Sequence, residues 1–345
     1  MFDLKILTFI IPACNSAAVL KHCIDSMLVP QILDQLEILI INSGSMDATA
    51  NVARDYCKQY PGTVRLISQG NRGRGGAVNT GCAAAAGKYL KVVDADAWVR
   101  TEHLCDYLAF LENCDADVVL THHRSVDARK NRYKHWKTYP ASFDKVCTLD
   151  EILMNRKDFD RCMNLYGITY RRDFYREKGL SLSENILYGE HEFAACPCCY
   201  AQSVALCDLY LHEYQVGQVT RRVADEDQRR HISDTGTVIR RLIAQQQSLP
   251  EGAGREYLAG KLQALVEGYL KIVLLAQPDR INGRLAAKAL MERCKGEAPR
   301  TYEITKKKYW ALLVLNRLHI SKGLLDWVMD TRFYQWLRGE HNYKE

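Results

Sequence analysis

The chain has 345 residues, of which 47% are hydrophobic and 26% are charged, a composition typical of a globular protein. Its formal net charge is +6, and the positive excess lies in residues 221–345, which carry 23 Lys and Arg against 15 Asp and Glu. A bias of this size, without a nucleic-acid-binding motif, argues against a nucleic-acid partner. The length favours two structural regions, or one domain of about 200–250 residues with an appendage.

The N-terminus does not read as a secretory leader, because Asp3 and Lys5 come early and the apolar run stops at Pro12. We therefore expect a cytoplasmic protein whose 13 cysteines are reduced thiols. The CPCC stretch at 196–199 lacks the paired spacing of a structural zinc site and is read as packed small residues. No apolar run approaches the ~20 residues that a membrane-spanning helix requires.

Residues 1–120 alternate between short apolar runs and helical patterns. The runs predict strands at 6–11, 36–41, 64–68, 89–93 and 116–120. The helical patterns lie between them, at 17–28, 46–60 and 76–86, and Ser45 is the expected N-cap of the second helix. This alternation predicts an α/β fold with a mostly parallel sheet, in which a ligand sits beyond the carboxyl ends of the strands.

The rest of the chain is less regular and then helical. We expect helices at 148–156 and 186–202, and a long strand or strand pair at 203–216. From about residue 225 the pattern stays helical, with segments at 237–247, 256–276, 283–294 and 310–320. The sequence therefore predicts a mostly helical C-terminal region, 221–345, after a first domain of residues 1–220.

Two aspartates separated by one alanine follow the fourth apolar run. On an extended strand, Asp94 and Asp96 would point to the same side. Two like charges this close raise the pKa of one of them unless a positive group lies between them. A hard divalent cation, Mg²⁺ or Mn²⁺, shared with substrate phosphates would meet this need, whereas the plainer interpretation is a solvated turn or helix cap.

The stretch GNRGRGGAVNTG, residues 70–81, resembles a dinucleotide fingerprint only superficially. It follows the third strand rather than the first, and Val78 stands where the last glycine is required. Two interpretations stay open. Either it is a glycine-lined helix start, or its backbone amides and Arg72 or Arg74 approach a phosphate or sugar.

The stretch YGEHEF places Glu190 and Glu192 at a predicted helix start. Both could simply oppose the helix dipole. They would not share a helical face, so only one is expected to point into the crevice, where it could serve as a general base. His212 ends the next apolar run, and it is either a structural histidine or a phosphate contact.

Four stretches together resemble inverting family 2 glycosyltransferases of the GT-A fold. They are ILTFIIPACNSAAVLKHCIDSML, EILIINSGSMDATANVARDYCKQYP, GNRGRGGAVNTGCAAAAGKYLKVVDADAWV and YGEHEF. The resemblance runs through residues 4–100 almost without gaps and then thinly to about 220. The middle and tail are also similar, more loosely, to bacterial enzymes that build surface polysaccharides.

The resemblance implies a donor half, 1–120, and an acceptor half, 121–220. It implies a metal, Mn²⁺ or Mg²⁺, on Asp96 and Asp94, and Glu190 as the base that deprotonates a saccharide or lipid-linked acceptor. The nucleotide-sugar donor, with UDP as the expected nucleotide, would be bound by Pro12, Asn15, Asn42, Ser43, Ser45, Arg72, Gly73, Asn79 and Asp94.

The sequence departs from the family pattern at several positions. Asn42 and Ser43 stand where two aspartates are common, and Val78 and Gln215 replace frequent arginines. An inactive nucleotide- or sugar-binding homologue and a nucleotidyltransferase therefore remain alternatives. The segments 306–320 and 326–339 either pack on their own domain or lie on the inner face of an anionic membrane.

Overall fold

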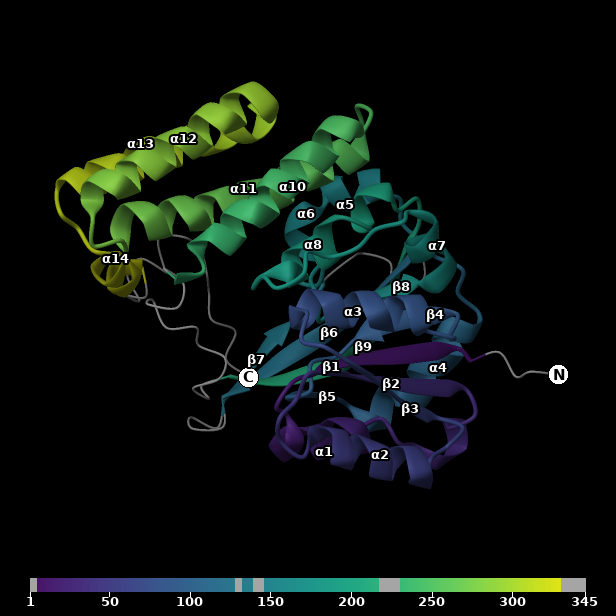
Figure 1. Cartoon of the computed structure of the whole chain (residues 1–345). Coiled ribbons are helices and arrows are strands. Elements are labelled where there is room, and N and C mark those ends of the chain that lie inside the picture. The colour runs from purple at the N-terminus through teal and green to yellow at the C-terminus, as the bar shows by residue number, and fades with distance from the viewer. Residues whose placement is uncertain (1–4, 128–131, 139–145, 217–229, 330–345) are drawn as a thin grey trace. The chain divides into compact units, whose positions relative to one another are not determined.

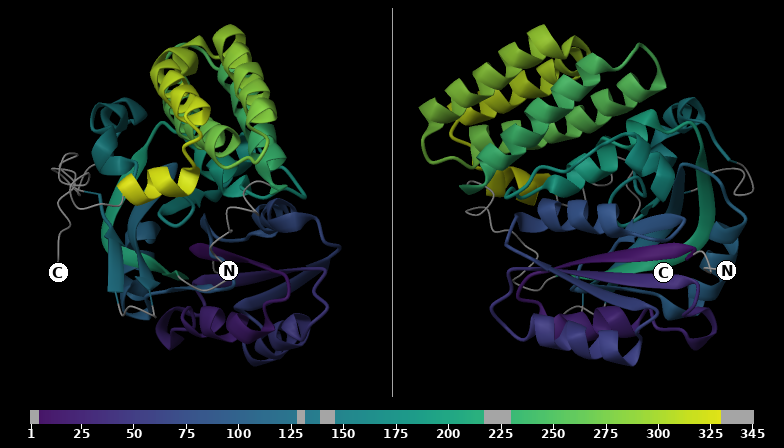
Figure 2. Two further views of the ribbon diagram at one scale, coloured as in Figure 1. Left: turned by 90° about the vertical axis from the view of Figure 1, so that its left-hand side faces the viewer. Right: turned by 45° about the vertical axis from the view of Figure 1, so that its right-hand side comes forward.

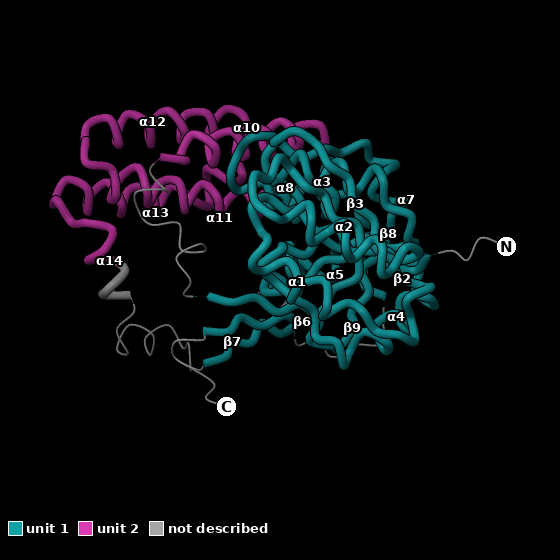
Figure 3. Tube along the Cα trace, turned by 60° about the horizontal axis from the view of Figure 1, so that its bottom comes forward, with its two compact units in different colours: residues 1–222, 250–258 teal, residues 223–249, 259–345 magenta. Residues whose placement is uncertain are grey.

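The computed structural model describes residues 5–127, 132–138, 146–216 and 230–329 (Figure 1). The chain divides into two compact units, coloured separately in Figure 3. The first contains residues 1–222 and 250–258, and the second contains residues 223–249 and 259–345. The first unit holds the sheet, and the second is helical.

The N-terminal half of the sheet is parallel, as expected. Its order is β3-β2-β1-β4, and the strands are β1 (Leu7–Ala13), β2 (Leu36–Ser43), β3 (Val64–Gln69) and β4 (Tyr89–Val92). These four of the five expected strands are thus confirmed, and the fifth, 116–120, overlaps β6 (Val118–Asp127). The carboxyl ends of β1 to β4 lie on one edge, which is where the polar residues after β1, β2 and β4 come together.

The other half makes the sheet mixed rather than mostly parallel. Its strands are β5 (Ala97–Val99), β6 (Val118–Asp127), β7 (Arg132–Trp136), β8 (Ile168–Arg171) and β9 (Val204–Val216). β8 is antiparallel to both of its neighbours, β4 and β6. β7 is antiparallel to β6, and β5 is antiparallel to β9. β6 and β9 are parallel. The predicted segment 203–216 is one long strand, β9. The antiparallel strands β5, β7 and β8 were not predicted, because they are only three to five residues long and carry no apolar run that stands out.

Helices cover both faces of the parallel half, as Figure 1 shows. α1 (Ala17–Asp25), α2 (Thr49–Gln59) and α4 (Leu104–Glu112) share a core with Phe9 and Ile11 of β1. Side chains alternate along a strand, so Ile10 faces the other way, toward α3 (Gly73–Ala84). A Cβ at Gly81 would lie 2.3 Å from Cγ2 of Ile10, so only glycine lets α3 approach this closely.

Four shorter helices complete the first unit: α5 (Leu149–Met154), α6 (Arg156–Phe159), α7 (Arg172–Glu177) and α8 (Gly189–Ala195). The hydroxyl of Thr148 and the carboxylate of Glu151 form a capping box at the start of α5. The expected helix 186–202 is shorter than predicted. The cysteines of the CPCC stretch are buried.

The second unit is built from α10 (Ile232–Ser248), most of α11 (Ala253–Leu275), α12 (Arg280–Glu297), α13 (Pro299–Arg317) and α14 (Lys322–Met329). α12 and α13 lie side by side (Figure 2), and Nη1 of Arg284 donates to Oδ1 of Asn316 at 2.8 Å. Among the described residues, no helix has both the length and the apolar character to cross a membrane. The predicted segment 326–339 lies largely outside the described residues.

Candidate active site

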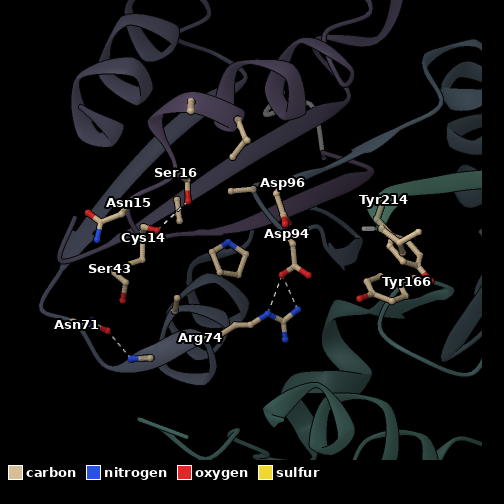
Figure 4. Close-up of a pocket in the computed structure, with 18 residues that line it drawn as sticks. Cys14, Asn15, Ser16, Ser43, Asn71, Arg74, Asp94, Asp96, Tyr166 and Tyr214 are labelled. Atoms are coloured by element: carbon tan, nitrogen blue, oxygen red, sulfur yellow. Dashed lines mark hydrogen bonds and ion pairs between the residues drawn. The ribbon is translucent and has the colours of Figure 1, made fainter. Parts of the chain in front are cut away.

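A cleft of about 830 Å³ opens at the carboxyl edge of the parallel strands, within the first unit (Figure 4). Amides and hydroxyls gather at one end, charged groups lie in the middle, and two aromatic rings close the other end. Among the described residues, its lining is Pro12, Ala13, Cys14, Asn15, Ser16, Ala18, Val19, Ser43, Asn71, Gly73, Arg74, Ala77, Asp94, Ala95, Asp96, Tyr166, Tyr214 and Val216. The predicted site residues among them are Pro12, Asn15, Ser43, Gly73, Asp94 and Asp96.

The loop after β1 is held in place by the loop after β2. The backbone N–H of Asn15 donates to Oγ of Ser45 at 3.0 Å, and Oδ1 of Asn15 accepts from the backbone N–H of Met46 at 2.9 Å. Asn15 itself has a left-handed backbone, with φ of 49°. Ser45 therefore supports Asn15 from behind and does not line the cleft.

Ser45 is not the N-cap of α2, so that expectation was wrong. The helix begins four residues later, at Thr49, and the carboxylate of Asp47 accepts from the Thr49 backbone N–H at 2.9 Å. Hydrogen bonds from the Thr49 hydroxyl and amide hold the pKa of Asp47 below its ordinary value. The Ser45 hydroxyl is instead engaged by Asn15.

Asn42 and Ser43 end β2 and point to opposite sides, as neighbours on a strand must. The amide of Asn42 donates to Oγ of Ser68 at 3.4 Å, which ties β2 to β3, and Asn42 does not line the cleft. Ser43 does line it, and its hydroxyl accepts from Nε2 of Gln69 at 3.2 Å. Of this pair, only Ser43 is placed to meet a ligand.

Asp94 and Asp96 both line the cleft, but not because they continue a strand. β4 ends at Val92, and a turn follows in which the backbone N–H of Ala97 donates to the carbonyl of Asp94 at 2.9 Å. Behind the turn, the thiol of Cys23 donates to that same carbonyl at 3.6 Å. Burial, and then the charges of both aspartates, raise the pKa of Cys23, so it remains a neutral thiol.

The positive group beside Asp94 in this structure is Arg74. Its Nε and Nη2 each lie 2.8 Å from Oδ1 of Asp94, and its Nη1 lies 3.9 Å from Oε2 of Glu190. Burial alone would lower the pKa of Arg74, but the charges of Asp94 and Glu190 outweigh it and raise the pKa above the ordinary value. The guanidinium is therefore permanently charged.

The other predicted residues of the glycine-rich stretch are used differently. Arg72 Nε donates to Oε2 of Glu184 at 2.8 Å, and Asn79 exchanges two hydrogen bonds with the backbone of Leu182, at 2.7 and 2.9 Å. Neither Arg72 nor Asn79 lines the cleft. Gly73 does; its φ is +69°, and a Cβ there would lie 2.9 Å from the backbone nitrogen of Asn185. The backbone at this point requires glycine.

The two glutamates at the start of α8 point in different directions, as expected. Glu192 is fully buried and accepts from the backbone N–H and the hydroxyl of Ser183, at 2.6 and 2.7 Å. The side chain of Glu190 is 39% exposed and lies near the guanidinium of Arg74. Glu190 is not one of the lining residues, but of the two only it is within reach of the charged centre.

The aromatic end of the cleft is formed by Tyr166 and Tyr214. Their rings stack with centroids 4.3 Å apart and an interplanar angle of 21°. His212, the predicted phosphate contact, is fully buried behind them, with its ring 5.0 Å from that of Tyr166, and does not line the cleft. Tyr166 was missed because it lies in the irregular segment 121–185, where no periodicity singles it out.

The carboxylates of Asp94 and Asp96 fit a hard divalent cation such as Mn²⁺ or Mg²⁺, since both offer only oxygen ligands. Among the described residues, no group of three or more His, Cys, Asp or Glu side chains is arranged to hold a metal. Water and oxygens of a bound phosphate could complete the coordination of such an ion. That donor set suits a metal that arrives together with a nucleotide.

Residues 8–189 match the model of glycosyl transferase family 2, and the chain belongs to this family. It is 27% identical over 192 residues to the uncharacterized glycosyltransferase EpsJ of Bacillus subtilis, and the aligned region covers 54% of each protein. It is 43% identical over 90 residues to the uncharacterized glycosyltransferase YibD of Escherichia coli, and the aligned region covers 26% of each protein. The chain thus spans about half the length of EpsJ and less of YibD.

The fold is that of solved GT-A glycosyltransferases. Residues 1–349 of S. aureus TarS, crystallised with UDP-GlcNAc, superpose with a TM-score of 0.65 at 16% identity, over 99% of this chain and 93% of the other. The mannosyltransferase PcManGT of Pyrobaculum calidifontis, in complex with GDP-Man and Mn²⁺, gives a TM-score of 0.51 at 13% identity, over 94% and 88% of the two chains. The expected family and the GT-A fold with a helical C-terminal region are both confirmed.

Proposed function

We propose that this protein transfers a sugar from a nucleotide-sugar donor to an acceptor hydroxyl by a single displacement that inverts the anomeric carbon. One observation carries the proposal. A carboxylate pair, Asp94 and Asp96, shares a cleft with Asn15 and Ser43, and a third carboxylate, Glu190, lies 3.9 Å from the arginine that contacts Asp94. The cleft thus offers separate groups for a nucleotide and for a metal–diphosphate, and Glu190, beside Arg74, is the candidate for proton transfer.

The donor would lie along the cleft with its nucleotide at the end formed by Asn15, Ser16, Ser43 and Asn71. Hydroxyls and amides there suit a base and ribose, which need hydrogen-bonding partners rather than charge. The TarS structure with UDP-GlcNAc supports a UDP-sugar as the donor. In this arrangement residues 1–120 bind the donor and residues 121–220 receive the acceptor.

The reaction needs one proton transfer and one departing diphosphate. Glu190 would accept the proton of the acceptor hydroxyl, which attacks the anomeric carbon as the bond to the diphosphate breaks. Arg74 brings a fixed positive charge to the middle of the cleft, where negative charge grows on the leaving group. A divalent cation held by Asp94 and Asp96 would add further stabilisation of that charge when bound.

The acceptor would be a saccharide or a lipid-linked saccharide in the synthesis of a bacterial surface polysaccharide, at the cytoplasmic side of the membrane. The stacked rings of Tyr166 and Tyr214 support a carbohydrate acceptor, because aromatic faces pack well on the apolar face of a sugar ring. In the helical unit, Trp310 is 60% and Val314 54% exposed on α13, one turn apart, next to the exposed Lys307 and Arg317. A face of this composition suits peripheral contact with anionic lipid.

Calorimetric titration of UDP and GDP, first with Mn²⁺ and then with EDTA, tests this function. We expect one nucleotide to bind only with Mn²⁺, and Asp96→Ala to abolish that binding. Asp115→Ala is the control, since this acid is 89% exposed and lies outside the cleft lining. Binding without turnover of any nucleotide sugar would favour the inactive homologue. Release of pyrophosphate from a nucleoside triphosphate would instead favour the nucleotidyltransferase.

A further inference from the structure

Arg74 is the one cationic side chain among the residues that line the cleft, within the part of the chain that the structure describes. Figure 4 shows its guanidinium below the carboxylate of Asp94, with dashed lines from two nitrogens to one oxygen. Both contacts, from Nε and Nη2, are 2.8 Å to Oδ1 of Asp94. Arg74 therefore occupies one of the two carboxylate oxygens that Asp94 could offer to a metal.

The pairing has a clear electrostatic cause. Arg74 stands in the first turn of α3, a helix of 12 residues, where the helix dipole is positive and disfavours a cation. Its side chain is only 29% exposed, so solvent compensates little of its charge. Asp94 supplies the missing negative charge, and Oε2 of Glu190 lies 3.9 Å from Nη1 of Arg74. Any ligand that draws Arg74 away from Asp94 must offer an anion in return.

A divalent cation alone does not meet that condition. It would compete with two N–H donors for Oδ1 of Asp94 and would meet repulsion from a guanidinium a few ångströms away. A nucleotide diphosphate does meet it, because its oxygens give Arg74 a bidentate partner of the kind that guanidinium groups prefer. The metal and the diphosphate would thus help each other to bind.

We propose that Arg74 is an exchangeable counter-ion. It closes Asp94 to a bare metal ion in the empty cleft, and it moves to the donor's phosphate oxygens when the nucleotide sugar arrives. This inference rests on the proposed function, because it requires a metal on Asp94 and a diphosphate beside it. Its consequence is ordered loading, in which free divalent metal is held weakly until the donor is present.

Arg72 provides a matched control two residues away. It is also paired with a glutamate, Glu184, but it lies outside the cleft lining and its side chain is 49% exposed. Neutralising either arginine changes the net charge by the same amount. Only the loss of Arg74 should free a carboxylate of the metal site.

The experiment titrates Mn²⁺ into the full chain and follows free Mn²⁺ by its electron paramagnetic resonance signal, with and without UDP. Without UDP, Arg74→Gln should bind Mn²⁺ about tenfold more tightly than wild type, and Arg72→Gln should match wild type. With Mn²⁺ saturating, Arg74→Gln should bind UDP about tenfold more weakly. Arg74→Lys, which keeps the charge but loses the bidentate geometry, should fall between wild type and Arg74→Gln in both measurements.

These opposite changes in Mn²⁺ and UDP affinity are the signature of counter-ion exchange. The inference is overturned if Arg74→Gln leaves Mn²⁺ affinity unchanged or lowers it, or if Arg72→Gln raises it equally. It is also overturned if UDP affinity is unaffected. If wild type binds no Mn²⁺ even with UDP, the metal-dependent function itself fails, a result distinct from an unchanged Arg74→Gln variant.

Discussion

Lys91 donates from Nζ to the backbone carbonyl of Tyr166 at 2.9 Å and to that of Ile168 at 3.2 Å, and its side chain is completely buried. The contact joins β4, which leads into the Asp94–Asp96 turn, to the segment that presents Tyr166 at the far end of the cleft. Burial lowers the pKa of Lys91 from 10.5 to about 7. One buried amino group therefore joins both sides of the cleft.

This pKa makes stability depend on pH in a defined window. Between pH 7 and 10.5 the unfolded chain holds a proton on Lys91 that the folded chain has largely lost, so stability rises with pH there. From pH 7 to 8.5 the free energy of unfolding of wild type should increase by about 1–2 kcal/mol relative to that of Lys91→Met. Urea denaturation at both pH values measures this difference. Lys88 is a partly exposed neighbour of Lys91. Lys88→Met should therefore show the same increase in the free energy of unfolding between these pH values as wild type.

Glu190→Gln should lower kcat for sugar transfer by about 10²- to 10⁴-fold, because a carboxamide cannot accept the acceptor's proton. The affinity for UDP with Mn²⁺ should stay within about twofold of wild type, since Glu190 does not line the cleft. Glu184→Gln, which alters the glutamate paired with Arg72, is the matched control and should retain activity. Full turnover by Glu190→Gln would remove Glu190 from the mechanism.

Gly75→Ala should destabilise the protein although alanine is the better helix former. A Cβ at Gly75 would lie 2.1 Å from the backbone oxygen of Ser183, the residue that Glu192 anchors, so the loop or helix must shift. We expect a loss of about 1–3 kcal/mol in thermal or urea unfolding. Gly70→Ala, with nothing within 4 Å of its added methyl group, should stay within about 0.5 kcal/mol of wild type. Equal effects at both positions would contradict the steric explanation.

Two exposed cysteines should report directly on cleft occupancy. Cys14 lines the cleft, whereas Cys105 is exposed on α4 and is not part of the lining. UDP with Mn²⁺ should therefore slow alkylation of Cys14 about tenfold or more and leave Cys105 unchanged. Peptide mass spectrometry after timed labelling measures both sites in one sample. Protection of neither thiol would place the nucleotide elsewhere.

The sequence predicted β1 to β4 and β6 because each contains a short apolar run. It predicted α1 to α3 from the helical patterns between those runs, and the helical spacing is clearest in α2. It could not predict β5, β7 and β8, which are short and take their places in the sheet from tertiary pairing. The acidic pair was expected at the carboxyl edge and lies there. Arg72 was the arginine expected to bind the nucleotide sugar, but it is Arg74 that lines the cleft. Two arginines that flank one glycine differ only in where the fold directs them.

The three chemistries along the cleft also give it a direction. A nucleotide sugar carries its hydrogen-bonding base and ribose, its charged diphosphate and its sugar ring in a fixed order. The cleft offers amides and hydroxyls and then charges in that same order, and the stacked rings that we assign to the acceptor lie beyond them. A donor bound end for end would set its base against the rings and its sugar among the amides. The cleft should therefore bind a nucleotide sugar in one orientation, with only its sugar end accessible to an acceptor.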